Sequence, residues 1–94
     1  MNDELDFSET PSPEQVAKDL SAMGDSVFVI DSRIENGPSE DQTQEEANDE
    51  VDRNVRHLEI MLTKDYIQDS GSELATFQVA VTDGNAYIAA HPVV

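Results

Sequence analysis

The stretch "VDRNVRHLEIMLTKDY", residues 51–66, carries apolar side chains at the spacing of an α-helix. Its apolar positions follow one another at intervals of four, three, four and four residues: Val51, Val55, Leu58, Leu62 and Tyr66. Ile60, Met61 and Ile67 widen this stripe. Residues at such intervals share one helix face, which is normally buried against a neighbouring element. The spacing predicts a helix over residues 40–69 that needs a partner along this face.

An acidic run precedes the stripe. Seven carboxylates and no basic residue lie between Glu40 and Asp52. Ser39 and Gln42 have the spacing of a capping box, and acids in the first turns of a helix complement its dipole. A solvated helix face therefore explains the run. On a helix, however, the carboxylates also form rows whose spacing resembles a line of phosphates. One row holds Asp41, Glu45, Asp49 and Asp52, and the other holds Glu46 and Glu50.

Residues 74–91 fit two templates. A helix capped by Ser72 places seven residues on one face, with Gly84 allowing a close helix approach and Val79 left outside the face. That face holds Leu74, Phe77, Ala80, Val81, Gly84, Tyr87 and Ile88. A β-hairpin turning at Asp83 and Gly84 is the alternative, and it would give an α+β fold with a helix packed on a small antiparallel sheet. We favour the helix.

The preferred fold is therefore mainly α. An antiparallel pair of helices, residues 40–69 and 72–90, forms its centre. Six residues are expected to pack the pair together: Val55, Leu58, Leu62, Phe77, Val81 and Ile88. A short helix and one extended segment are expected to lie against this pair.

The N-terminal third supplies those two elements and an arm. The composition of residues 1–11 predicts a flexible acidic arm whose apolar anchors are Leu5 and Phe7. The length of residues 12–94 predicts a single small domain. Ser12, Pro13 and Gln15 are typical of a helix start, and Gly24 of its end. The β-branched and aromatic residues at 27–30 predict the extended segment. Leu5, Phe7, Val27 and Phe28 are the candidate apolar partner-binding residues.

The charge of the chain restricts its partners. Residues 1–52 hold 16 acids and 2 bases, and the whole chain has a formal net charge of −16. Such a field repels nucleic acids and anionic membrane surfaces and attracts basic protein surfaces. We therefore expect a protein partner, either a basic surface or another copy of the chain in a homo-oligomer, and no direct nucleic-acid binding. No segment approaches the roughly 20 apolar residues of a membrane-spanning helix.

The sequence gives little support for a catalytic, metal-binding or cofactor-binding site. There are no cysteines, and His57 and His91 are 34 positions apart, so we expect no metal site and no cofactor. His57 is expected at the boundary of the core. Nucleophile elbows and glycine-rich phosphate loops are missing from the sequence, so we expect no catalytic residues and no enzyme activity.

The segment "RNVRHLEIMLTKDYIQDSGSELATFQVAVTDGNAYIAA", residues 53–90, resembles segments of small uncharacterised acidic proteins of tailed bacteriophages. The shared features are an HLEIML-like helix, an SG turn and an aromatic-ended helix. The resemblance implies a viral accessory or virion protein, in the host cytoplasm or the virion, and transfers no functional residues. The expected function is a non-catalytic protein–protein interaction, with a nucleic-acid-mimic inhibitor of a host DNA- or RNA-binding protein as the alternative. In the alternative, the carboxylate rows of residues 41–52 contact that protein.

Overall fold

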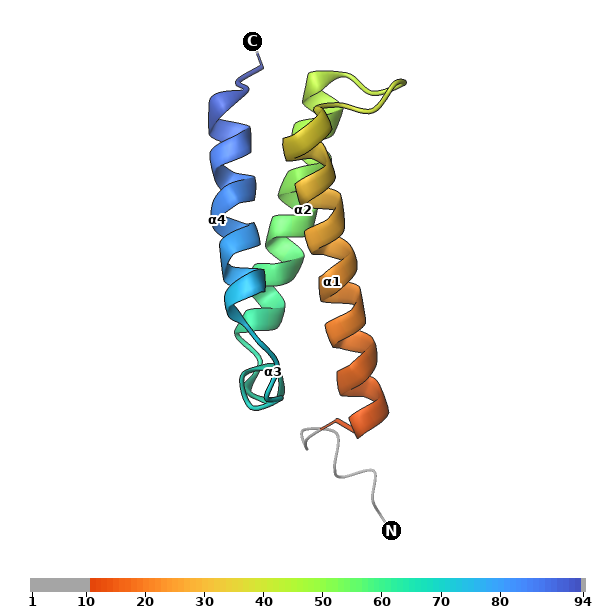
Figure 1. Cartoon of the computed structure of the whole chain (residues 1–94), viewed down its shortest axis with the longest axis vertical. Helices are drawn as coiled ribbons and strands as arrows, with labels where there is room; N and C mark the ends of the chain where they lie inside the picture. The colour runs from red at the N-terminus through yellow and green to blue at the C-terminus, as the bar shows by residue number, and fades with distance from the viewer. Residues whose placement is uncertain (1–10, 94) are drawn as a thin grey trace.

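A computed structural model describes residues 11–93 and shows a bundle of helices (Figure 1). The elements are α1 (Pro13–Asn36), α2 (Gln44–Leu62), the single-turn α3 (Asp65–Gln68) and α4 (Ala75–Ala90). The chain runs along α1, returns along α2 and rises again along α4, so that α1, α2 and α4 all pack against one another. The mainly α prediction is confirmed, and the alternative hairpin over residues 74–91 is wrong because α4 occupies that segment.

α1 begins as the sequence indicates. Ser12 is the N-cap, its side chain accepts a hydrogen bond of 3.1 Å from the backbone N–H of Gln15, and Pro13 is the first helical residue. The side-chain amide of Gln15 donates to Asp19 Oδ1 at 2.9 Å and does not form a capping box with Ser12. A serine N-cap followed by proline therefore suffices to start this helix.

The end of α1 differs from the prediction. The helix continues through Gly24 to Asn36, so the extended segment predicted at residues 27–30 is wrong. Met23, Ser26 and Ile30 lie at helical spacing and are all buried. Their burial against the other helices outweighs the β-propensity of the segment, because strand propensity depends mainly on how side chains pack. The helix ends at Gly37, whose φ of 73° suits a residue without Cβ.

α2 is shorter than predicted at its N-terminal end. The capping box that forms is Thr43 with Glu46, each side chain accepting from the backbone N–H of the other residue. Ser39 and Gln42, the predicted box, lie before the helix, where the Ser39 N–H donates to Gln42 Oε1 at 3.0 Å. The two boxes are four residues apart in sequence, and the later one starts the helix.

The break after α2 also differs from the predicted continuous helix to residue 69. Thr63 closes the last turn, with its backbone N–H and its hydroxyl both donating to the carbonyl of Ile60. Lys64 is extended, and α3 then runs in a new direction. This change of direction places Ile67, which is fully buried, beneath the bundle and leaves Tyr66 half-buried beside α1.

α4 starts at Ala75, so the predicted cap at Ser72 is wrong, and Leu74 precedes the helix without a side-chain cap. The predicted helical face is correct: Ala80, Gly84 and Tyr87 are buried, and the other members of that face are half-buried. Val79, which the face left out, is 56% exposed.

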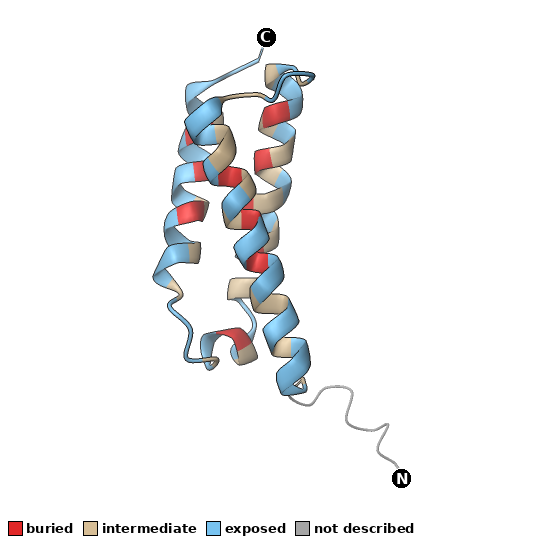
Figure 2. Cartoon of the chain, turned by 45° about the vertical axis from the view of Figure 1, so that its right-hand side comes forward, coloured by how far each residue is buried: buried red, intermediate tan, exposed pale blue. Residues whose placement is uncertain are grey.

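The core lies where α1, α2 and α4 meet (Figure 2). A Cβ on Gly84 would lie 2.5 Å from Val55 Cγ2, and 3.3 Å from both Ile30 Cγ2 and Val51 Cγ1. Gly84 therefore allows the backbone of α4 to contact the branched side chains of both other helices. Of the six residues predicted to pack the pair, Val55 and Leu58 are buried and the rest are half-buried against them. α1, the helix that was expected to lie against this pair, contributes Met23 and Ile30 to the same core.

We predict that Gly84→Ala destabilises the protein by about 1–3 kcal/mol, because the added methyl group overlaps Val55 in a packed core. Gly24→Ala is the matched control, since a Cβ there has no neighbour within 4 Å. Gly24 lies inside α1, so that change should stabilise by about 0.5–1 kcal/mol through helix propensity. Urea unfolding followed by circular dichroism measures both. Equal stability of the two variants would contradict the close approach at Gly84.

Candidate functional site: two grooves and an acidic hollow

The first groove lies between α1 and α4. It has a volume of about 340 Å³, with Val27, Val79 and Ala80 among its apolar lining residues and Asp31 and Asp83 also in the lining. Val27, one of the predicted partner-binding residues, is half-buried and packs against the core. The groove thus combines an apolar floor with carboxylates from both helices.

Phe28 follows Val27 on α1 but is not one of the residues that line this groove. It is 72% exposed. One residue turns about 100° around a helix axis, so Phe28 projects from the solvent side of α1 next to Val27. Val79 on α4 is also exposed, and we name Phe28, Val27 and Val79 the α1–α4 patch. The other two predicted apolar partner-binding residues, Leu5 and Phe7, lie outside the described residues, as does the predicted arm apart from Pro11.

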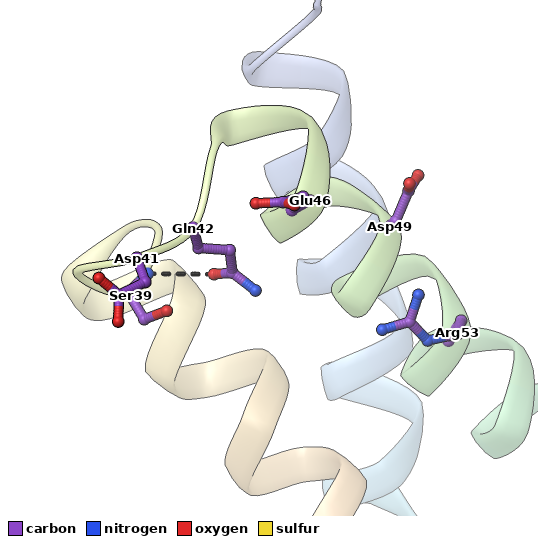
Figure 3. A pocket seen from close by; sticks show the side chains of 6 residues that line it. All are labelled: Ser39, Asp41, Gln42, Glu46, Asp49 and Arg53. Carbon is purple, nitrogen blue, oxygen red and sulfur yellow. Dashed lines mark hydrogen bonds between the residues drawn. The ribbon is translucent and has the colours of Figure 1, made fainter.

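The acidic run forms a hollow beside the loop that joins α1 to α2 (Figure 3). Its volume is about 420 Å³, and Asp41 and Ser39 come from the loop while Glu46, Asp49 and Arg53 come from α2. The predicted row that begins at Asp41 is wrong, because Asp41 precedes α2 and only the later members are helical.

The loop is held by Arg33 and Gln42. Arg33 Nη1 donates to Gln42 Oε1 at 3.0 Å, and Gln42 Nε2 donates to Glu50 Oε1 at 2.9 Å. Arg33 Nε lies 3.9 Å from the same Glu50 oxygen, an ion pair without a hydrogen bond. Glu50 therefore joins α2 to the end of α1. This network was not predicted from the sequence, although Arg33 is the basic residue nearest before the acidic run.

The six predicted acidic-face residues consequently fall into two groups. Glu46 caps α2, Glu50 pairs with Arg33, and Asp52 Oδ2 accepts from Arg56 Nε at 2.8 Å. These three carboxylates have structural partners. The exposed remainder comprises Asp41, Glu45 and Asp49.

The second groove lies between the start of α1 and α3. It has a volume of about 480 Å³, and its lining includes Val16, Leu20 and Tyr66 with Asp65 and Asp69. The Tyr66 hydroxyl donates to Asp19 Oδ2 at 2.9 Å and fixes the ring against α1. This hydrogen bond, partial burial and the negative charge of Asp19 all raise the pKa of Tyr66 above 10.

His57 lies at the core boundary, as predicted. Its Nδ1 is 2.8 Å from Ser26 Oγ, and the serine is 4% exposed. The hydrogen bond joins α2 to α1 and satisfies the buried hydroxyl. Within residues 11–93, no group of three or more His, Asp or Glu side chains is placed to hold a metal ion. None of the helices described here has the length and apolar composition needed to cross a membrane.

Comparison of the chain with protein-family models, with curated proteins and with solved structures finds no significant match.

We predict that Asp19→Asn lowers the pKa of Tyr66 toward its usual value, because the ionised phenol no longer faces a carboxylate. A raised pKa in the folded state stabilises the protein below about pH 10 and loses this effect as pH rises through the raised value. Titration by ultraviolet absorbance measures the shift. Tyr66→Phe assigns the transition, since the chain has two tyrosines. An unchanged titration in Asp19→Asn would show that the hydrogen bond does not form in solution.

Proposed function

We propose that this chain is a non-catalytic protein-interaction module whose α1–α4 patch binds a partner protein. The observation that carries the proposal is the exposure of Phe28, which is 72% accessible on the outer side of a well-packed helix. A large aromatic side chain has two rotatable bonds and a large apolar area, and such residues often dominate binding energy at interfaces. The groove between α1 and α4 offers further apolar surface from Val27 and Val79.

The partner is proposed to be a different protein. Two copies of a chain with net charge −16 repel one another, and the groove carboxylates Asp31 and Asp83 add to this repulsion at the patch. A virion or accessory role in a tailed bacteriophage, as the resemblance of residues 53–90 implies, is compatible with a small chain that acts by binding.

We predict that Phe28→Ser abolishes capture of the partner from a lysate of the natural host, while the fold is retained because Phe28 lies outside the core. Ile60→Ser is the matched control, since Ile60 is 57% exposed on α2 and lies outside the α1–α4 patch. Affinity capture with the three proteins, followed by mass spectrometry, identifies bands kept by the wild type and by Ile60→Ser. Bands that all three proteins retain equally would exclude the patch as the binding surface.

A second candidate function is the nucleic-acid mimic. The observation that favours it is the exposure of Asp41, Glu45 and Asp49 at one end of the bundle, beside a hollow that a basic side chain could enter. In this function, Lys or Arg side chains that normally contact phosphates would contact these carboxylates, and binding would weaken with salt.

We predict that removing these three charges abolishes binding if the mimic function holds, and leaves folding intact because the carboxylates that hold α2 are untouched. The test variant combines Asp41→Asn, Glu45→Gln and Asp49→Asn. A control with the same net charge changes three exposed acids elsewhere: Glu35→Gln, Glu59→Gln and Glu73→Gln. Capture from host lysate at low and high salt compares them. Equal capture by the two variants would reject the mimic function.

A further inference from the structure

The groove between α1 and α3 is a second surface, separate from the α1–α4 patch. The first turns of α1 extend past the ends of α2 and α4, and α3 is the element at this end of the bundle (Figure 1). Val16 and Leu20 lie one turn apart on the same side of α1, and both are only half-buried.

The lining of this groove is apolar with a negative rim. Val16, Leu20 and the ring of Tyr66 provide the apolar surface, and Asp65 and Asp69 are exposed carboxylates one turn apart. Among the residues that the structure describes, the lining contains no basic side chain. An occupant must therefore offer apolar side chains together with positive charge.

This chain cannot supply such an occupant. Residues 1–10 hold four acids and no base, and a second copy brings a net charge of −16. Both would place like charges beside Asp65 and Asp69, which is unfavourable. A helix face formed by Val16 and Leu20 is commonly covered by another helix.

We infer that the α1–α3 groove binds a basic amphipathic helix of a partner protein. Its apolar side chains contact Val16, Leu20 and Tyr66, and its Lys or Arg side chains pair with Asp65 and Asp69. This surface is additional to the α1–α4 patch, and the two can be tested separately because they share no lining residue.

The absence of tryptophan from the chain gives a clean assay. The probe is a synthetic peptide of about four helical turns, with Leu on one face, Lys on the other and a single Trp among the Leu residues. Titration with the full chain should change the Trp emission saturably, and added salt should weaken binding. A peptide with Glu in place of Lys should not bind. If the Lys peptide shows no saturable binding, the inference is overturned.

Paired variants locate the binding. Asp65→Asn with Asp69→Asn should weaken the affinity for the peptide about threefold to tenfold, as expected for two partly exposed ion pairs. Asp31→Asn with Asp83→Asn removes the same charge from the α1–α4 groove and should change the affinity less than about twofold. Val16→Ser should weaken binding without a change in helix content by circular dichroism, because Val16 lies outside the buried core.

Four other results would overturn the inference. Equal weakening of peptide binding by both pairs of Asp substitutions would show that the peptide is attracted by net charge alone. Weakening of peptide binding only by Asp31→Asn with Asp83→Asn would place the peptide in the α1–α4 groove. If light scattering gave twice the mass of one chain, and Val16→Ser returned it to that of one chain, a second copy would be the occupant of the groove. If Phe7→Ser bound the peptide more tightly than the wild type, residues 1–10 would compete with the peptide and would be the occupant of the groove. If Phe28→Ser left partner capture unchanged, the proposed function of the α1–α4 patch would be contradicted, whereas the inference about the α1–α3 groove would not.

Discussion

Contact between the backbone of α4 at Gly84 and the branched side chains of α1 and α2 determines the geometry of the bundle. Without a side chain at this position, Val51 and Val55 of α2 and Ile30 of α1 meet the α4 backbone directly. Ala80 and Tyr87 lie about one turn away on either side and are drawn into the same interface. The Tyr87 hydroxyl then accepts from Gln44 Nε2 at 3.0 Å, at the first residue of α2. In a chain without tryptophan, close helix approach achieves the burial that large side chains provide elsewhere.

The sequence predicted the part of this contact between α2 and α4, because helical periodicity is a property of the face that packs. The α2 stripe and the α4 face were both recognised from spacing alone, and Gly84 fell in the middle of the second. The same reasoning failed for α1, where four consecutive apolar residues at 27–30 obscure the period. A run of this kind fits a strand or a buried helix equally, and only the partner helices decide. Helix ends were also ambiguous, since Ser39–Gln42 and Thr43–Glu46 are two adjacent capping boxes of equal local quality.

The position at which α2 starts also explains why the candidate site could be predicted only in part. If α2 began at residue 40, Asp41 would continue a helical row of carboxylates. Because Thr43 is the cap, Asp41 lies in the loop and Glu46 is used in capping. Glu50 pairs with Arg33, a contact between residues 17 positions apart that local pattern analysis does not address. Phe28 was chosen as part of an extended segment in need of a partner and is exposed as a helix residue, whereas Val79 was identifiable as the residue that the α4 face left over.

Charge and apolar surface act together in this molecule. Phe28 and Val79 expose apolar area that would favour aggregation on a neutral protein. A net charge of −16 opposes contact between copies, and the carboxylates in both grooves place part of that charge beside the apolar residues. An acidic apolar surface makes the same hydrophobic contact but is repelled, and a neutral one makes the contact alone. A basic apolar surface gains both the contact and the charge attraction. In the proposed function, charge selects the partner while the apolar contacts supply most of the affinity, since rim charges affect specificity and association rate more than binding strength.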